Sequence, residues 1–377
     1  MRIDGAAGRM VRLDGWRPRP QRMRQRARPG RSESVARVKE ALRAIVSRCL
    51  VVSGATRLGR RLHDREGTLI LYAHRVADDD EAFFQGLPPR MFREQLAYLT
   101  RHYDVIPLST LVVCIAENRP PPTRSVVLTF DDGFRDNVEH ALPILDEFGV
   151  SATIFVVTQS LSDGRLPWPQ RVGFMFQHTR EAQVHHDILG HHAISLAGEQ
   201  QRRKVYARML QVLAPLERQP RDQIIEQLGL TLAVAPPDDR MMTWEHARAM
   251  LARGHNIGAH TYSHALLAQV PSDEARWEME RSRLDIEDHL GIRHPSFCFP
   301  GGSTTPALRR LARELGFSSC FVPNPAQRIN RPAAVDNFSL VRLALPDGPG
   351  FNLEAELEGP FHAIRRCTGR YADVGGR

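Results

Sequence analysis

The chain has 377 residues, of which 42% are hydrophobic and 25% are charged, so it is long enough to bury one large core or two smaller ones. Residues 1–65 hold 18 Lys and Arg against 5 Asp and Glu, whereas the remaining residues hold 33 against 38, so the basic character belongs to the N-terminal segment. No apolar run reaches the roughly 20 residues that a membrane-spanning helix needs. Five widely spaced cysteines without a Cys-x-x-Cys pair argue against a disulfide framework and against a thiolate zinc site.

The sequence predicts two parts in the N-terminal segment. Residues 1–33 are rich in Arg, Pro and Gly, which predicts a disordered basic tail, and the absence of interleaved aromatic residues gives no reason to expect a nucleic-acid partner. The pattern of a signal peptide is missing at the start, so we expect a cytoplasmic protein. Residues 34–65 carry apolar side chains at helical spacing, which predicts an amphipathic helix. Its apolar face fits two placements equally well. It can pack against the body of the protein, or residues 1–62, tail and helix together, can contact an anionic membrane.

Strands and helices then alternate, which predicts a parallel α/β architecture. A buried strand over 68–73 ends at His74. The elements expected after it are a helix over 89–103, an extended piece over 104–108, a strand over 125–128, a helix over 137–148 and a strand over 152–157. The strand at 125–128 leads into Asp131 and Asp132, and Gly133 permits a tight turn after them.

The alternation stops between about 163 and 239, where we expect a helical insertion that shapes a substrate groove. Its clearest element is a helix from about Glu199 to Leu216. Two histidine pairs, at 185–186 and 191–192, lack supporting carboxylates or thiolates, so we interpret them as part of a polar surface loop rather than as a metal site.

A second polar motif follows the insertion. Thr243 is the expected N-cap of a helix that ends at Gly254, and a short strand over 256–259 leads into His260 and His264; a helix over 272–290 comes next. One carboxylate and two imidazoles make a three-ligand site for a divalent metal, with positions left open for water and substrate. Asp-Asp-Gly alone is an ordinary turn and His-x-x-x-His alone a chance spacing, but each motif here follows a strand, where α/β proteins place their active sites.

The two motifs, 127–133 and 260–264, resemble the first two motifs of the polysaccharide deacetylases, the NodB-homology family, over about residues 66–345. The resemblance implies an α/β fold that is a distorted (β/α) barrel with a helical insertion. It also implies that Asp131 is the general base and that Asp132, His260 and His264 hold the metal. Residues after 346 give no clear pattern and are expected to form a C-terminal tail.

The segment Ser296-Phe-Cys-Phe-Pro-Gly-Gly302 resembles the third family motif. By position, Gly301 presents the backbone N–H that faces the developing oxyanion, and Phe299, Pro300 and Gly302 contact substrate. Cys298 stands where the family usually carries an arginine that pairs with the catalytic aspartate. Arg342, in a strand-like run, is the best replacement, although a surface salt bridge explains an arginine there equally well.

The resemblance to the poly-N-acetylglucosamine branch implies that His74 is the general acid, in preference to His362 near the C-terminus. We therefore expect a metal-dependent hydrolase that removes N-acetyl groups from the amino sugars of an N-acetylated glycan. Zn²⁺ is the expected metal, and the same ligands accept Co²⁺, Ni²⁺, Mn²⁺ or Fe²⁺. Three alternatives remain open: deformylation or deacetylation of a lipid-linked amino sugar, hydrolysis of a small cyclic amide, and glycan binding without catalysis.

Overall fold

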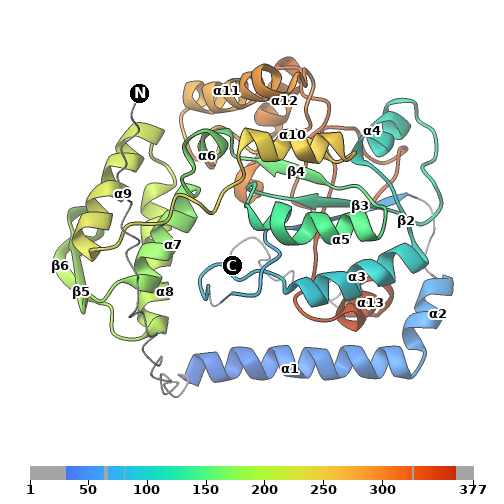
Figure 1. Ribbon diagram of the computed structural model, residues 1–377, viewed down its shortest axis with the longest axis horizontal. Helices are drawn as coiled ribbons and strands as arrows, with labels where there is room; N and C mark the ends of the chain where they lie inside the picture. Colours follow the sequence, from blue (N-terminus) through green and yellow to red (C-terminus); the bar gives the residue numbers. More distant parts are fainter. Residues whose placement is uncertain (1–30, 63–66, 80, 325–326, 362–377) are drawn as a thin grey trace, which may run out of the picture.

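The structure is a computed structural model that describes residues 31–62, 67–79, 81–324 and 327–361. Figure 1 shows a twisted sheet in the centre with helices around it, a second group of elements (α7–α9) to one side, and a long helix, α1, along the lower edge. Most of the predicted basic tail, residues 1–30, lies outside the described residues.

The centre of the molecule is a parallel sheet. Its four main strands lie in the order β7-β4-β3-β1, and each pairs in parallel with its neighbour. They are β1 (Thr68–Ala73), β3 (Ser125–Phe130), β4 (Thr153–Val156) and β7 (Asn256–Ala259). The short strands β2 (Asp104–Val105) and β9 (Leu343–Ala344) pair in parallel with β3 and β1, and β8 (Ile329–Asn330) is antiparallel to β1. Every residue of β3 is buried, as its largely apolar sequence predicts.

Single bridges continue this sheet into a distorted barrel. The bridges run from Ala259 to Phe297, from Phe297 to Cys320 and from Phe321 to Leu340. The chain then passes into β9, which pairs with β1. The sheet therefore returns to its first strand, and the predicted distorted barrel is confirmed.

Helices cover the outside of the barrel. These are α3 (Pro89–His102), α4 (Leu108–Ala116), α5 (Leu142–Glu147), α6 (Thr158–Asp163), α10 (Trp244–Ala252), α11 (Ser272–Leu290) and α12 (Pro306–Glu314). The helix predicted over 137–148 is divided into a π-helical turn, Asn137–Ala141, and α5. Pro143 has no N–H to donate, and the N–H of Leu142 bonds five residues back to Asn137. Thr243 caps α10, as expected, by accepting a hydrogen bond from His246 N.

The insertion forms a lobe with its own hydrophobic core. Its elements are α7 (Trp168–His178), β5 (Gln183–His186), a 3-10 turn (Asp187–Leu189), β6 (Gly190–Ser195), α8 (Glu199–Leu213) and α9 (Arg218–Leu232). The prediction of a surface loop at the histidine pairs is therefore wrong, because β5 and β6 form an antiparallel hairpin there. Val184, in β5, is buried in the core of the lobe.

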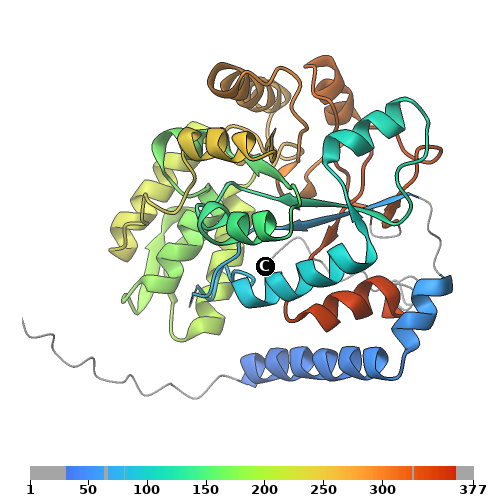
Figure 2. The ribbon, with the colours of Figure 1, turned by 45° about the vertical axis from the view of Figure 1, so that its right-hand side comes forward.

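The C-terminal region corrects another expectation. The segment predicted as a tail contains helix α13 (Gly350–Glu358), which packs against α3 and against the N-terminal helices. Figure 2 shows α13 lying between α3 and α1. Its pattern is hard to recognise in sequence because two of its buried residues are glutamates, Glu356 and Glu358.

The predicted amphipathic segment forms two helices, α1 (Arg31–Val52) and α2 (Ala55–Leu62). They bind α13 through polar groups: Arg43 pairs with Glu356 at 2.9 Å, and Thr56 donates to Glu354 at 2.7 Å. The apolar side of α1 faces outward, with Leu42 and Ile45 each 59% exposed. No helix in the described part of the chain is long and apolar enough to cross a membrane.

Candidate metal and catalytic site

The parallel strands bring the predicted motifs to one edge of the sheet. β1, β3 and β7 point the same way, so the residues that follow them meet at their carboxyl ends. The backbone there is unusual, because Asp132, Thr261 and His264 have positive φ angles of 73°, 65° and 62°. Such angles cost about 1–3 kcal/mol each in non-glycine residues and concentrate at functional sites.

Three buried side chains form a compact triangle. The Oδ1 atom of Asp132 lies 3.4 Å from His260 Nε2 and 3.3 Å from His264 Nε2. Ligands about 2.0–2.1 Å from a tetrahedral zinc ion stand roughly 3.3–3.4 Å apart. Asp132 Oδ1 is buried and has no hydrogen-bond partner among the described residues. The triangle therefore fits a divalent metal ion.

Neighbouring groups hold these ligands in orientation. His260 Nδ1 lies 2.8 Å from the Cys298 carbonyl oxygen, which can only accept, so Nδ1 carries the proton and Nε2 is left for a metal. Gln170 Nε2 donates to Asp132 Oδ2 at 2.9 Å. The indole N–H of Trp168 donates to the His264 carbonyl oxygen at 2.9 Å. Two of these three hydrogen bonds are donated by residues of α7, in the insertion.

Burial and the neighbouring ligands set the pKa values of the metal-binding side chains. Burial on its own would raise the pKa of Asp132, but the imidazoles of His260 and His264 hold that pKa well below its ordinary value. Burial lowers the pKa of His264. Burial would also lower the pKa of His260, but Cys298 and the Asp132 carboxylate raise it well above its ordinary value. A charged carboxylate and neutral imidazoles are the forms that bind metal, so a metal ion would displace a proton from His260.

The second aspartate has a different partner. Burial would raise the pKa of Asp131, but the Arg342 guanidinium lowers it below its ordinary value. Arg342 donates two hydrogen bonds to the Asp131 carboxylate, both 2.8 Å long, and is nearly buried. The predicted replacement for the family arginine is thus in contact with Asp131, and the surface salt bridge considered above does not describe it.

Cys298 completes this second cluster. Arg342 donates to its sulfur at 2.9 Å, and burial raises the pKa of the thiol. Asp131, His260 and Cys298 also stand at metal-ligand spacing. A guanidinium already neutralises Asp131 there, so the triangle around Asp132 is the better cation site.

His74 and the third motif lie beside this centre. His74 follows β1 and lies near enough to lower the pKa of both Asp131 and Asp132 by its charge. Phe299 and Pro300 are buried, with the Phe299 ring against Phe297 in the core. The substrate contacts expected of Phe299, Pro300 and Gly302 stay predictions. Gly301 is exposed, with a φ of 57°. His362 lies outside the described residues.

Gln170 and Trp168 are neighbours of the site that sequence reasoning missed. Their only sequence signal is the Pro167-Trp168-Pro169 run. A proline in the first turn of a helix is favourable, and here it lies at the start of α7, whose residues Trp168 and Gln170 contact the metal triangle.

Comparison with known proteins identifies the family. The sequence profile of the polysaccharide deacetylases matches residues 118–320, more than half of the chain, so the chain belongs to the polysaccharide deacetylase family. Deacetylases of this family hydrolyse N-acetyl amide bonds in glycans and depend on a metal, and Asp132, His260 and His264 offer a group of ligands for one. The match includes both aspartates and both histidines but neither His74 nor Arg342.

Individual relatives are distant. The Bacillus subtilis protein YxkH is 26% identical over 100 residues, which is 26% of this chain and 36% of YxkH. The solved structure of the Streptococcus pyogenes deacetylase PplD in complex with acetate is 18% identical, with a TM-score of 0.50 over 76% of this chain and 95% of that one. IcaB from Ammonifex degensii is 19% identical, with a TM-score of 0.50 over 77% of this chain and 96% of that one. These two structures share the fold.

Proposed function

We propose that this protein is a metal-dependent hydrolase that removes N-acetyl groups from the amino sugars of a glycan. The observation that carries the proposal is the buried triangle of Asp132, His260 and His264, with the charged Asp131 beside it. The ligand set favours Zn²⁺, and Co²⁺, Ni²⁺, Mn²⁺ or Fe²⁺ can take its place.

A metal ion held by Asp132, His260 and His264 would supply a Lewis acid, able to polarise the amide carbonyl and to lower the pKa of water. Asp131 accepts the proton of the attacking water, and Arg342 keeps the Asp131 carboxylate charged and correctly oriented. The backbone N–H of Gly301 stabilises the oxyanion, a role worth about 3 kcal/mol per donor. His74 protonates the leaving amine, which otherwise departs poorly.

The test is acetate release from N-acetylated glycans by the wild-type protein and by Asp131→Asn. We expect the asparagine variant to lose about 10²- to 10⁴-fold in kcat, because it cannot accept a proton, and to keep its bound metal. Hydrolysis at the wild-type rate would remove Asp131 from the mechanism. Glycan binding with no acetate release by the wild-type protein would instead support the binding-only alternative.

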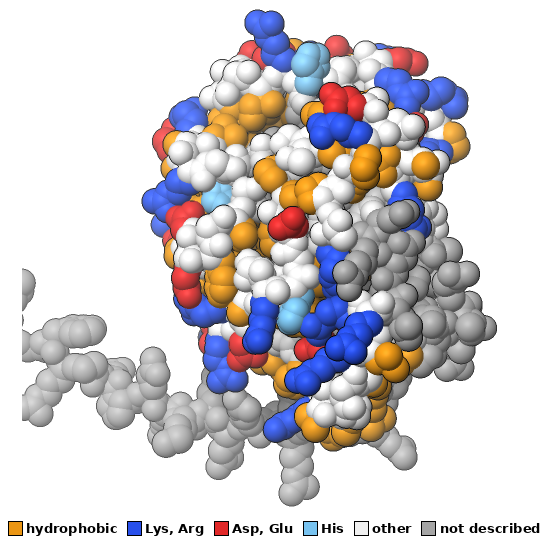
Figure 3. All heavy atoms as spheres, turned by 90° about the vertical axis from the view of Figure 1, so that its right-hand side faces the viewer, with side chains coloured by type: hydrophobic (Ala, Val, Ile, Leu, Met, Phe, Trp, Pro, Cys, Tyr) orange, Lys and Arg blue, Asp and Glu red, His pale blue; other side chains and the backbone are white. Residues whose placement is uncertain are grey.

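A second candidate substrate is a lipid-linked amino sugar, deacylated or deformylated at the cytoplasmic face of a membrane. The outward side of α1 favours it: Leu42, Ile45 and Val52 are 59%, 59% and 80% exposed. Arg48 and Arg57 are exposed beside this row. Figure 3 shows basic and apolar side chains gathered on the lower part of the face where α2 and the end of α1 lie. An apolar row flanked by arginines matches an anionic bilayer surface.

Flotation with anionic vesicles tests this contact. The wild-type protein is expected to float with vesicles rich in phosphatidylglycerol at low salt and to dissociate at high salt. The triple variant Leu42→Ser, Ile45→Ser, Val52→Ser is expected to remain in solution, whereas Leu230→Ser, at an exposed leucine on α9, floats normally. A dimer that the triple variant converts to a monomer, without any flotation, would assign the row to self-association.

A further inference from the structure

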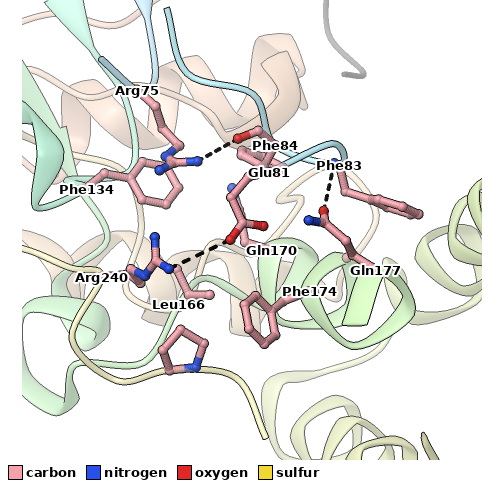
Figure 4. Close-up of a pocket in the computed structure, with 12 residues that line it drawn as sticks. Arg75, Glu81, Phe83, Phe84, Phe134, Leu166, Gln170, Phe174, Gln177 and Arg240 are labelled. Carbon is pink, nitrogen blue, oxygen red and sulfur yellow. Dashed lines mark hydrogen bonds and ion pairs between the residues drawn. The ribbon is translucent and has the colours of Figure 1, made fainter. Parts of the chain in front are cut away.

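The insertion packs against the barrel through hydrogen bonds as well as apolar contacts. Figure 4 shows one of them, where Gln177 of α7 accepts the N–H of Phe83, in the β1–α3 loop, at 3.0 Å. Other hydrogen bonds from α7 and α9 end at Asp132 or in residues 260–264, the segment with both histidine ligands. We call this segment the ligand loop. The insertion is therefore attached to the residues that surround the metal triangle.

The backbone of the ligand loop is unfavourable by itself. Thr261 and His264 have φ angles of 65° and 62°, a left-handed conformation that non-glycine residues keep only where their surroundings hold it. Both residues are buried. The contacts that hold this backbone therefore also determine how the His264 side chain is directed at Asp132.

The barrel holds the first half of the ligand loop. Two backbone N–H groups at the start of α6, those of Thr158 and Gln159, donate to the carbonyl oxygens of Thr261 and Tyr262. The two distances are 3.3 Å and 2.9 Å. The carbonyl oxygens of residues 263 and 264 accept hydrogen bonds from side chains of the insertion instead.

Arg221 of α9 is central to the contacts of this second half. It is only 1% exposed, although it is an arginine. Its Nη2 donates to the Ser263 hydroxyl at 2.6 Å and lies 3.5 Å from the Ser263 carbonyl oxygen. Its guanidinium also lies over the Trp168 ring, 5.4 Å from the centroid, and the Trp168 indole donates to the His264 carbonyl oxygen. Arg221 therefore reaches residue 263 directly and residue 264 through Trp168.

A buried carboxyl group, Glu278 of α11, holds the same serine from the barrel side. Glu278 is fully buried and accepts hydrogen bonds from the Ser263 N–H, at 2.8 Å, and from the Ser263 hydroxyl. The hydroxyl thus accepts from Arg221 and donates to Glu278. Burial raises the pKa of Glu278, and the charge of Arg221 opposes that rise. The serine is therefore fixed between two buried groups of opposite charge.

Stability alone gives no reason for these two buried groups. Apolar side chains of the same volume often stabilise a core as well as a buried ion pair does. Arg221 also leaves Nε and Nη1 buried with no hydrogen-bond partner among the described residues, which is costly. The geometry instead explains the arginine by what it holds in place.

We infer that Arg221 is a positioning residue for the metal site. Through Ser263 and Trp168 it fixes the second half of the ligand loop and thereby the direction of His264. The inference rests on the proposed function, because it takes His264 as a metal ligand. It gives α9 of the insertion a part in the metal site, although α9 supplies no ligand.

Zinc affinity and the spectrum of bound Co²⁺ test the inference. In Arg221→Met we expect the dissociation constant for Zn²⁺ to rise about 10- to 100-fold, as is typical when a group that orients a metal ligand is lost. The visible absorption of bound Co²⁺, which depends on ligand geometry, should change as well. A residue that only stabilises the fold would leave that spectrum unaltered in the folded protein. Arg221→Lys retains the charge and should recover part of the affinity.

Two further variants complete this test. Arg221→Met leaves Glu278 without its cationic neighbour, so Glu278→Gln is added to it; this double variant should recover stability in urea yet bind Zn²⁺ as weakly as the single variant. The matched control is Arg202→Met. Arg202 of α8 donates only within the insertion, to the carbonyl oxygens of Leu196 and Gln177 at 3.1 Å, so zinc affinity should stay unchanged. Wild-type affinity and spectrum in folded Arg221→Met, or in the double variant, would overturn the inference.

Hydrogen exchange in the metal-free protein separates this inference from the proposed function. Amides of the ligand loop, such as that of Ser263, should exchange faster in Arg221→Met than in the wild type or in Arg202→Met, because exchange reports local opening. Unchanged exchange would contradict the role of Arg221 even in a protein that binds zinc. Faster exchange in the variant, together with a wild type that binds no zinc, would support the hold of Arg221 on the loop and contradict the proposed function.

Discussion

At the scale of single residues, the site is defined by two aspartates that are neighbours in sequence but have different partners. Asp132 faces two imidazoles, and Asp131 faces a guanidinium. Two carboxylates this close would repel each other and raise one pKa. Separate partners, a guanidinium for Asp131 and two imidazoles for Asp132, lower the pKa of both carboxyls, so one is available to a metal and the other to a proton.

The planar fork of Arg342 matters as well as its charge. Arg342→Lys keeps the positive charge but cannot make two parallel bonds to Asp131. We expect kcat/KM for acetate release to fall about 10- to 100-fold, because the base is less firmly oriented, with no change in bound metal.

The matched control is Arg313→Lys. Arg313 and Asp336 form a surface ion pair at 3.0 Å in which both side chains are 59% exposed. Such pairs contribute little to the stability of the fold. Activity should stay at the wild-type level in this control. Equal activity in Arg342→Lys would mean that Asp131 needs no bidentate partner.

Asp136 gives a pH-dependent prediction away from the metal. Burial raises its pKa from 3.8 to about 6 despite the pair with Arg75 at 2.8 Å. The folded state therefore holds this proton more tightly than the unfolded state, so the stabilisation is complete below about pH 4 and is lost as the pH rises through 6. The free energy of unfolding of the wild type, relative to Asp136→Asn, should fall by roughly 1–3 kcal/mol between pH 4 and 7.

Urea unfolding of both proteins across this pH range measures that difference. Other carboxylates titrate in both proteins and cancel. A difference that stays constant, or that grows toward neutral pH, would show that the pKa of the Asp136 carboxyl is not raised.

At the scale of elements, the strands were the most predictable part. Each site-bearing strand is a short apolar run that ends in polar residues, so the sequence alone places Asp131, Asp132, His260 and His264 at strand ends. Arg342 was predicted differently, as the replacement for the family arginine whose place Cys298 takes, because a strand-like run carries it. The burial of Phe299, whose ring packs against Phe297, was not predicted, because the contact depends on how the segment 296–302 packs on the core.

Two features could not be predicted because they depend on contacts between distant segments. Gln170 reaches Asp132 only through the way the insertion folds back on the barrel. Helix α13 buries Glu358, which accepts hydrogen bonds from Tyr103 at 2.7 Å and from Arg124 at 2.5 Å. Those partners lie more than 230 positions away in the chain, so its sequence resembles that of an exposed tail.

The packing of α13 can be tested directly. Leu353 is fully buried in the main core, so Leu353→Ala should lower the free energy of unfolding by about 2–5 kcal/mol, as urea denaturation would measure. Leu230→Ala, at a position 83% exposed, should change it by less than about 0.5 kcal/mol. A loss of similar size in the two variants would place α13 outside the folded body.

At the scale of the whole molecule, the barrel and the insertion meet at the site, and the N-terminal helices lie at the edge of the body. The barrel supplies the metal triangle and Asp131, and the insertion supplies Trp168 and Gln170, which contact the ligands. The N-terminal helices add an outward apolar face. The helices α1 and α13 lie side by side in both ribbon views (Figures 1 and 2). The proposed membrane contact depends on this edge.

The central claim is that Asp132, His260 and His264 share one metal ion. Metal-free protein titrated with Zn²⁺ and analysed for bound metal after dialysis tests it most directly. We predict one tightly bound ion per chain in the wild type and in Asp131→Asn, and none in Asp132→Ala or His264→Ala, each checked for folding by circular dichroism. Stoichiometric zinc in folded Asp132→Ala, or none in the wild type, would contradict the account.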